Sequence, residues 1–479
     1  MEQTNTFQAA QAAWMAGAEL RRRRQRFKNY TYGNQWADPA DSADGKHTVT
    51  EGDAIRLSGR NPLTNNLIHR LIKVIIGRWH TMQLANDIYQ GDENFIKTNS
   101  LPELDARLLE EFLISGTAIQ RIGLDSSHNA VIDNVRPTDF FVNVHHDPRG
   151  RDVELIGMLH SLPVNEVVRR FCHGSAAQAA RIRHIYDCDN HKENYTSPAA
   201  LGSDHAADSE FFHAQDVAST TPRCRVVEVW TRRSADVYLC HDHRDARAYA
   251  VPLSHQKKID TENRRRRRAG EPKIEARFSV QTVWYYTFFA PSGEVLSEGV
   301  SPYPHHGHPF VFKFFPLTDG EVHPFVEGLI DQQRYINRLI VSIDHTMQTS
   351  AKGVLLFPEQ QLVAGWTLAD VARQWSACDG IIPIRGGGVD NEPRQVVARG
   401  GDSQAYHLLD IQMKLFDQIS GVPDALLGRI SGTTGADLYN AQVENAASNL
   451  TDIFRTFASM LKTRNAKAIS SENRDIPTL

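Results

Sequence analysis

One segment constrains the fold more than any other: residues 328–357 read GLIDQQRYINRLIVSIDHTMQTSAKGVLLF and contain a long apolar stripe. On a helix the stripe occupies one face, because its members are separated by seven, four, three and four residues: Leu329, Ile336, Ile340, Ile343 and Met347. A helix over 327–350 would be about 36 Å long and would end before Gly353. Such a helix needs neighbours that bury its stripe, either in the same chain or in other copies of it.

The composition is that of an ordinary globular protein. The chain has 479 residues, of which 41% are apolar and 23% charged, enough for roughly three domains or one elongated subunit of several layers. Apolar runs fall short of the ~18 residues of a membrane span, and the N-terminus lacks a secretory pattern, so we expect a cytosolic protein. Five scattered cysteines do not form a disulfide framework. The formal net charge of −4 argues against a protein that wraps nucleic acid.

Periodicity predicts an α+β fold. Helices are expected where apolar residues recur at helical spacing, at 6–28, 67–77, 101–116, 163–186, 368–374, 403–419 and 434–461. Hairpins are expected at 117–137 and 139–160, a small β-rich module from 222 onward, and single strands at 354–357 and 379–385. The last helix begins at a TGAD capping box, and Lys462, Arg464 and Lys467 are expected to meet its C-terminal dipole.

Three histidine clusters are candidates for metal chemistry. They contain His145 with His146, His241 with His243, and His305, His306 and His308. His241 and His243 alternate on a predicted strand, so both could bind one metal together with Cys240 or a distant carboxylate. No HExxH, CxxC, nucleophile or phosphate-loop motif accompanies them. We predict no catalytic residue, no metal and no cofactor, and a metal-dependent hydrolase remains an alternative.

An unbroken run of five arginines stands out locally: Arg264, Arg265, Arg266, Arg267 and Arg268. Five adjacent guanidiniums cannot all be buried, so the run is expected to be exposed and mobile. Two interpretations stay open. The run is either a solvated loop tip without a special role, or a patch that meets an acidic partner or the phosphate backbone of a nucleic acid.

The order of several segments resembles that of the portal proteins of tailed bacteriophages. A basic N-terminal helix leads into YGNQW, and NNLIHRLIKVIIG, EFLISGTAIQRI and DFFVNVHHDPRGRD follow. The order continues with HHGHPFVFKFFPLTDGEVHPFVEGLIDQQRYINRLIVSI and ends with QISGVPDALLGRISGTTGADLYNAQVEN. The resemblance covers most of the chain and rests on this order. An unrelated tail-adaptor structural protein is the alternative, and it would lack a clip inserted between paired stem helices.

The resemblance implies a structural role in the virion rather than an enzyme. Portal subunits form a ring, usually of twelve, at one capsid vertex, where the ring is the head-tail connector and the channel for packaging and ejection of double-stranded DNA. The implied partners are the major capsid and scaffolding proteins, the large terminase subunit, the head-tail adaptor and DNA without sequence specificity, with no membrane. Assembly would take place in the cytoplasm of the bacterial host.

The resemblance also implies a division of the chain. In order, it gives an N-terminal arm and wing at 1–160, a first stem helix region and connection at 161–221, a clip at 222–316, a second stem helix at 317–350, wing and channel loops at 351–433, and a long wing helix with a short crown at 434–479. Arg334, Arg338 and Lys352 would face the channel or a neighbouring subunit. The arginine run would lie in the clip and bind the terminase or the adaptor, and a protein partner is favoured over DNA.

Overall fold

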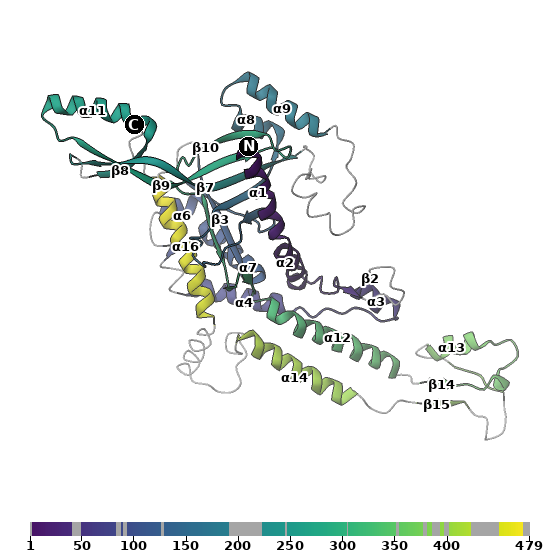
Figure 1. The fold of residues 1–479 in the computed structure, drawn as a ribbon. Helices are drawn as coiled ribbons and strands as arrows, with labels where there is room; N and C mark the ends of the chain where they lie inside the picture. The colour runs from purple at the N-terminus through teal and green to yellow at the C-terminus, as the bar shows by residue number, and fades with distance from the viewer. Residues whose placement is uncertain are drawn as a thin grey trace, which may run out of the picture. The chain divides into compact units, whose positions relative to one another are not determined.

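The computed structural model describes residues 2–40, 49–82, 88–89, 93–125, 129–190, 223–244, 247–303, 305–350, 354–376, 381–385, 393–396, 402–422 and 450–472. The chain forms two compact units. The first contains Met1–Lys28, Leu71–Glu327 and Ala447–Leu479, and the second contains Asn29–Arg70 and Gly328–Ala446. Both units contain helices and strands (Figure 1). The predicted mixture of α and β structure is therefore confirmed.

The first unit is built on a six-stranded antiparallel sheet. Its strand order is β10-β9-β7-β6-β5, and β8 pairs with β7. The strands are β5 (Phe140–Val142), β6 (Leu155–Pro163), β7 (Arg223–Asp242), β8 (Arg247–Pro252), β9 (Ile274–Phe289) and β10 (Val295–Val300). The predicted pairing within 139–160 is confirmed, because Phe141 is the register partner of Gly157. The predicted β-rich module from 222 onward begins with β7, a single strand of 20 residues.

Helices cover both faces of this sheet, as alternation along β7 requires. Val227 and Val229 pack with Ala13 and Trp14 of α1 (Glu2–Ala16). Val226 points the other way and packs with α8 (Val164–Phe171) and α9 (Ala176–Asn190). Because successive strand residues face opposite sides, the stretch 226–230 of β7 is buried on both faces.

A second sheet in the first unit has the order β11-β3-β4. It contains β3 (Thr117–Leu124), β4 (Ala130–Asn134) and β11 (Phe310–Phe314), with short β12 (Leu317–Thr318) and β13 (Glu321–Val322) pairing nearby. The predicted hairpin at 117–137 is confirmed by the antiparallel β3–β4 pair. The helices of this region are α4 (Leu67–Thr81), α6 (Glu93–Thr98), α7 (Leu101–Ser115) and α16 (Thr451–Glu472).

Aromatic contacts join α16 to α4 and α7. The ring of Phe457 lies 5.2 Å from Trp79 and 5.7 Å from Phe112 between centroids. Within α16, Phe454, Phe457 and Leu461 are fully buried, so the predicted apolar face is confirmed for this part of the helix. The predicted start at Thr434 and the residues up to 449 lie outside the described residues. Arg464 was expected at the helix dipole, but it is fully buried and bonded to Asp105, which corrects that prediction.

Two predicted helices are interrupted in the structure. The basic N-terminal helix divides at Gly17 into α1 and α2 (Ala18–Thr31). The expected helix at 163–186 ends at Phe171 and begins again at Ala176. The cause of the second break is local, because His173 and Gly174 both have positive φ, the conformation that commonly ends helices. The expected strand at 379–385 is also wrong for residues 381–385, which form no strand; Pro383 there has no N–H to donate.

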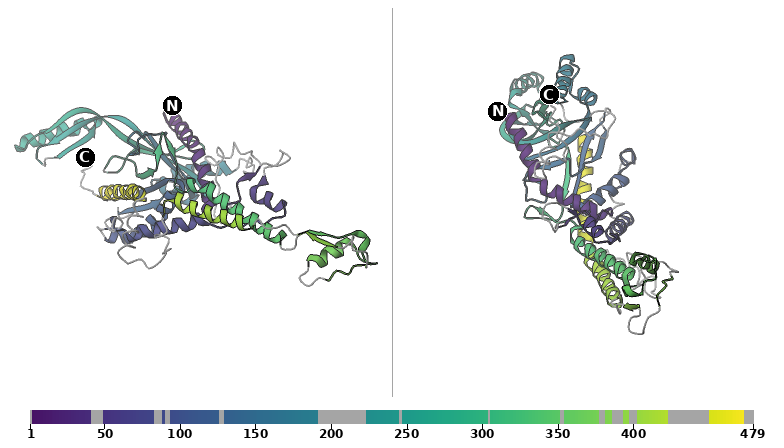
Figure 2. Two further views of the ribbon diagram at one scale, coloured as in Figure 1. Left: turned by 90° about the horizontal axis from the view of Figure 1, so that it is seen from below. Right: turned by 90° about the vertical axis from the view of Figure 1, so that its right-hand side faces the viewer.

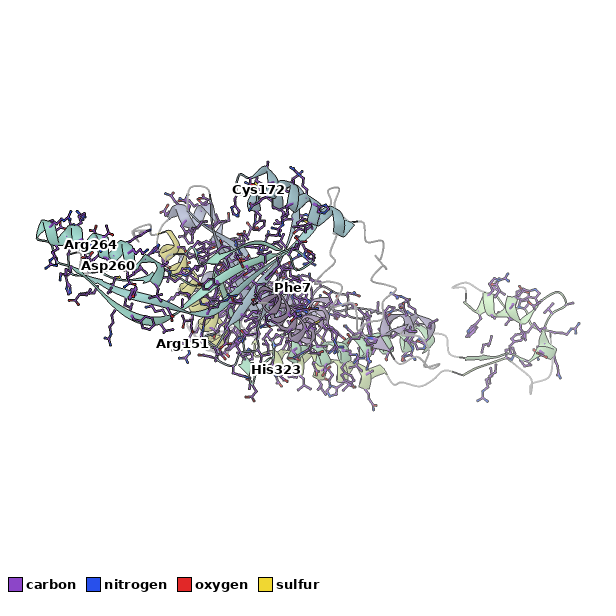
Figure 3. The ribbon with its side chains drawn as sticks, turned by 45° about the horizontal axis from the view of Figure 1, so that its top comes forward. Phe7, Arg151, Cys172, Asp260, Arg264 and His323 are labelled. Carbon is purple, nitrogen blue, oxygen red and sulfur yellow. The ribbon has the colours of Figure 1, made fainter. Side chains whose placement is uncertain are left out.

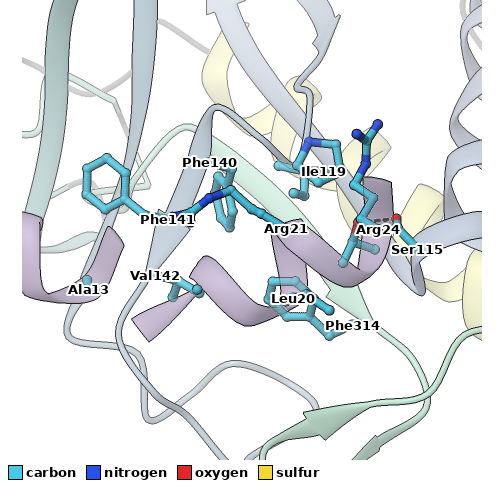
Figure 4. A pocket seen from close by; sticks show the side chains of 13 residues that line it. Ala13, Leu20, Arg21, Arg24, Ser115, Ile119, Phe140, Phe141, Val142 and Phe314 are labelled. Atoms are coloured by element: carbon cyan, nitrogen blue, oxygen red, sulfur yellow. Dashed lines mark hydrogen bonds between the residues drawn. The ribbon is translucent and has the colours of Figure 1, made fainter. Parts of the chain in front are cut away.

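A small cavity of about 70 Å³ lies beside the interruption between α1 and α2 (Figure 4). Its lining is mainly apolar and includes Ala13, Leu20, Phe140 and Phe314. Of the two arginines that line it, Arg21 lies over the Trp14 ring at 3.6 Å, and Arg24 donates to Glu111 at 2.6 Å. Because the guanidinium groups of Arg21 and Arg24 are engaged in these contacts, the cavity serves packing rather than ligand recognition.

In the second unit two helices run side by side in opposite directions, α12 (Glu327–Ser350) and α14 (Asp402–Ser420) (Figures 1 and 2). The side chain of Gln332 bonds to Gln412, and the Tyr406 hydroxyl lies 2.8 Å from the Met347 sulfur. Between the two helices the chain forms β14 (Val354–Leu356), η2 (Glu359–Gln361), α13 (Leu368–Ser376) and β15 (Arg394–Val396). This unit also contains β1 (Pro39–Ala40), β2 (Val49–Thr50) and α3 (Glu51–Leu57). The predicted bounds of the long helix are confirmed.

Candidate assembly and partner interfaces

The buried face of α12 carries polar residues as well as apolar ones. Gln333 and Asn337 are 0% and 1% exposed, and the apolar residues around them include Ile330, Ile336 and Val341. Burying an amide without partners costs free energy, so these side chains need hydrogen bonds within the protein. Their partners come from the segment before α4.

The two amides form a ladder with residues 35 and 65. Gln333 donates to the carbonyl of Asn65 at 2.6 Å and accepts from the backbone N–H of Leu67 at 2.9 Å. Asn337 donates to the side-chain oxygen of Gln35 at 2.5 Å and accepts from the N–H of Asn65 at 3.1 Å. The ladder fixes the register of α12 against this segment, because a slip would leave several buried groups without partners. The sequence prediction missed it.

The predicted apolar stripe of α12 is only partly buried within one subunit. Leu329 and Ile336 are buried, as expected. Ile340 and Ile343 are half-buried, and Met347 is 50% exposed, so one chain buries only part of the stripe, and burial of the rest by other copies stays a prediction. The contacts explain the difference: the first half of α12 is held by Gln35 and Asn65, whereas the Met347 end meets Tyr406 of α14.

Arg334 and Arg338, predicted to face the channel or a neighbouring subunit, share one carboxylate in this subunit. Glu51 is buried at the start of α3 and accepts from Arg334 at 2.9 Å and from Arg338 at 2.5 Å. The Arg338 side chain is nevertheless 50% exposed. The third predicted residue of this group, Lys352, lies outside the described residues.

The helix α14 has two apolar faces. One contains Phe416, which is 1% exposed, and Tyr406, which contacts α12. The other contains Ile411, Leu415 and Ile419, spaced four residues apart and 38%, 38% and 53% exposed. A surface helix of a soluble protein ordinarily has a single apolar stripe. The second stripe of α14 is therefore a candidate contact surface.

The far ends of β7, β8 and β9 form an arm that carries the predicted arginine run. A short core of Cys240, Val251, Ile259 and Ile274 holds η1 (Leu253–His255) and α11 (Gln256–Ala269) against these strands. The run lies within α11 and not in a loop, as Figures 1 and 3 show. The interpretation of the run as a loop tip is therefore wrong.

One arginine of the run is buried. Arg266 donates to both oxygens of Asp242, each at 2.7 Å, and to Glu262 at 3.0 Å. Hydrogen bonding from Arg266 lowers the pKa of Asp242 and keeps the pair ionised. The prediction that all five arginines are exposed is therefore wrong, because Asp242, 24 residues earlier in the chain, pairs with Arg266. The other four, Arg264, Arg265, Arg267 and Arg268, are exposed.

The histidine clusters do not converge into a metal site. His241 and His243 are in edge-to-face contact with centroids 4.4 Å apart, and His243 lies 3.4 Å from Glu275. His145 packs against Phe312 and Phe314, and its burial lowers its pKa. Burial also lowers the pKa of His305 to about 4. Within the described part of the chain, no group of three potential ligands is arranged to hold a metal.

A buried carboxylate, Glu228 of β7, joins the two sheets and was not predicted. It accepts from His160 of β6 at 2.6 Å, from Trp230 at 2.7 Å and from Arg121 of β3 at 3.2 Å. Burial alone would raise the pKa of Glu228, but Arg121, His160 and Trp230 outweigh it and lower the pKa to about 2. The sequence of β7 contained a signal for this site. An acid between two valines of a buried strand is itself expected to be buried, and its charge then needs a buried partner.

The chain matches the model of the Phage P22-like portal protein family over residues 7–470. No curated protein matches the chain significantly. No described helix combines the length and hydropathy needed to cross a bilayer. Because the family match extends over both units and nearly the whole chain, this protein belongs to the P22-like phage portal proteins, which are structural components of the phage head vertex.

Proposed function

We propose that copies of this chain close into a ring at the capsid vertex and form the channel through which double-stranded DNA is packaged and ejected. The observation that carries the proposal is the second apolar stripe of α14, formed by Ile411, Leu415 and Ile419. An exposed stripe of this length favours contact with another protein surface. A neighbouring copy is the occupant expected in an oligomeric ring, where each subunit presents the same surface.

The exposed row of α12 supports a channel role. Asp331, Tyr335, Arg338, Ser342 and Thr346 recur every three or four residues and are exposed. The row contains one acid and one base, so its formal charge is near zero. A lumen that released many counterions on binding phosphates would hold DNA and slow its passage. A row of low net charge avoids that affinity.

The pairing of α12 with α14 supports one placement of the stem. The resemblance implied a clip inserted between two stem helices, and residues 351–401 lie between this antiparallel pair. The division based on sequence instead placed the first stem helix in 161–221 and the clip at 222–316. We propose α12 and α14 as the stem pair, because α8 and α9 belong to the other unit. A label attached at Leu356 and one at Arg267, located by imaging of the ring, would distinguish the two placements.

Docking of the terminase and of the head-tail adaptor is also proposed for this protein. The resemblance to portal proteins implies that docking takes place at the clip, whichever segment forms that domain. Exposed apolar residues near the α12–α14 turn, including Leu356, Leu368, Ile381 and Ile384, offer the kind of surface that protein partners bury. Loss of terminase binding after their replacement by serine would support this assignment.

The test of the ring uses a double variant, Leu415→Asp with Ile419→Asp. Both side chains are partly exposed in the subunit, so the change should lower the melting temperature only slightly, while charge in the subunit contact should prevent ring closure. Ser342→Asp with Thr346→Asp adds the same two charges to the polar row of α12 and is the matched control. Light scattering should give rings for the wild type and the control. Rings of unchanged mass in the Leu415/Ile419 variant would contradict the proposed contact.

A further inference from the structure

We propose that the outward face of α11 is a docking surface for the phosphate backbone of double-stranded DNA. The face is defined by Lys257, Thr261, Arg264 and Arg268, which are separated by four, three and four residues and therefore lie on one side of the helix. Ile259 and Arg266 are buried on the opposite side. All four residues of the outward face are exposed.

The face carries mainly positive charge. Lys258 and Arg265 flank the row on one side, and the exposed Asp260 and Arg267 flank it on the other, so the eight side chains include six cations and one acid. In the part of the chain that the structure describes, Lys257, Lys258, Arg264 and Arg268 make no ion pair, whereas Arg265 pairs with Glu262 at 2.7 Å. From Lys257 to Arg268 the row is roughly 16 Å long, at 1.5 Å per residue. Six cations that repel one another beside a single acid favour an anionic partner.

The chemistry of the face favours DNA over an acidic protein. Protein interfaces use apolar and aromatic residues at their centre and are poor in lysine. The outward row of α11 has no apolar residue, and Thr261 is its one neutral member. Phosphate backbones, in contrast, are bound mainly by arginine, lysine and hydroxyl side chains without apolar contact. The sequence favoured a protein partner for the arginine run, and the helix face supports DNA instead.

The helix is held so that this face stays turned outward. Arg266 fixes one side through its two bonds to Asp242. Asn263 donates to the carbonyl of Ile274 at 3.0 Å and accepts from its N–H at 2.8 Å, which attaches α11 to β9. Gly270 ends the helix in the left-handed conformation. A surface ordered before binding loses less entropy when it meets its partner.

The inference rests on the proposed function only in that it takes DNA as the nucleic acid that reaches this protein. Several cations in each subunit, repeated around a ring, would hold a moving duplex through its phosphates. The face is therefore suited to DNA at rest against the protein and not to the lumen through which DNA passes. Sequence-independent binding is expected, because phosphate contacts carry no base information.

The experiment measures binding of the full-length protein to short duplexes of two unrelated sequences over a range of salt. The test variant is Lys257→Gln with Arg264→Gln and Arg268→Gln. The control, Arg60→Gln with Lys73→Gln and Arg183→Gln, removes the same charge from exposed cations elsewhere. A charge-conserving variant, Arg264→Lys with Arg268→Lys, tests the role of the positive charge. Light scattering on the same samples reports ring formation separately, so a failed ring and a failed DNA surface are told apart.

We expect the test variant to bind both duplexes more weakly and to reduce the slope of log affinity against log salt by up to about three, one for each phosphate that the variant no longer binds. The control and the charge-conserving variant should keep the wild-type slope. An unchanged slope in the test variant, or an equal decrease in the control, would overturn the inference. So would unchanged duplex binding combined with the disappearance of polyglutamate binding, because that result assigns the face to an acidic protein.

Discussion

The guanidinium of Arg464 and the carboxylate of Asp105 form two hydrogen bonds, 2.8 and 3.1 Å long, in a place where neither side chain is exposed. Arg464 lies on α16 and Asp105 on α7, 359 residues apart in sequence. Gln120 donates to the same carboxylate at 3.1 Å, and Tyr89 donates at 3.2 Å. The ion pair thereby fixes the last helix against the core of the first unit.

Arg464→Met should destabilise the protein by roughly 3–5 kcal/mol, because it leaves Asp105 charged and buried without its main partner. The double variant Arg464→Met with Asp105→Leu should lose less, since it removes both charges. Arg107→Met is the control, because Arg107 pairs with Glu103 on the surface and should cost at most about 1 kcal/mol. Denaturant unfolding measures all three. Equal losses for Arg464→Met and Arg107→Met would show that burial of the pair adds nothing.

Elements whose signals are local were predicted well. The bounds of α12 are the predicted ones, 327–350. The apolar spacing of the helix and the Lys-Gly pair that follows it are both signals carried by residues close to the element itself. Helix α7 and the β3–β4 hairpin follow the same rule. The break between α8 and α9 was missed although its signal was present: glycine at position 174 permits the positive φ that ends a helix.

Features that depend on distant partners were not predictable from periodicity. The buried state of Arg266 depends on Asp242 at the end of another strand, and nothing in a run of five arginines singles out the middle one. Gln333 and Asn337 interrupt an apolar helix face, and their partners are more than 260 residues earlier in the chain. A polar residue on an apolar face indicates a buried network, but the sequence does not name its other members.

Asn337→Ala should cost roughly 1–3 kcal/mol, because it removes one rung of the ladder and leaves the side chain of Gln35 and the N–H of Asn65 without that partner. Gln348→Ala on the same helix is the control, because Gln348 is exposed and bonds only to Asp344 among the contacts described. Thermal unfolding followed by circular dichroism compares the two. A loss for Asn337→Ala no larger than that of the control would mean that water replaces the ladder.

Arg266→Gln should loosen α11 without unfolding the rest of the chain. The change leaves Asp242 buried without its cation and removes the link that holds the helix on the arm. Faster amide hydrogen exchange is expected in α11 and at the ends of β7 and β9, with unchanged exchange in α7 and α16. Arg267→Gln removes the same charge from an exposed neighbour and should leave exchange as in the wild type. Protection of α11 that is equal in both variants would contradict the anchoring role of Arg266.

The network around Glu228 predicts a dependence of stability on pH. The pKa of this carboxyl falls from an ordinary 4.5 to about 2, because its bonds to Arg121, His160 and Trp230 outweigh the opposing effect of burial. A depressed pKa in the folded state means that the folded protein binds the proton less tightly than the unfolded chain. The stabilisation is therefore complete above about pH 5 and is lost as the pH falls toward 2.

Glu228→Gln should be less stable than the wild type at neutral pH, and the difference should shrink steadily as the pH is lowered through this range. Urea unfolding at a series of pH values measures that difference, which cancels the titration of the other carboxylates common to both proteins. A difference that stays constant with pH would show that Glu228 stabilises the sheets through packing and not through its charge.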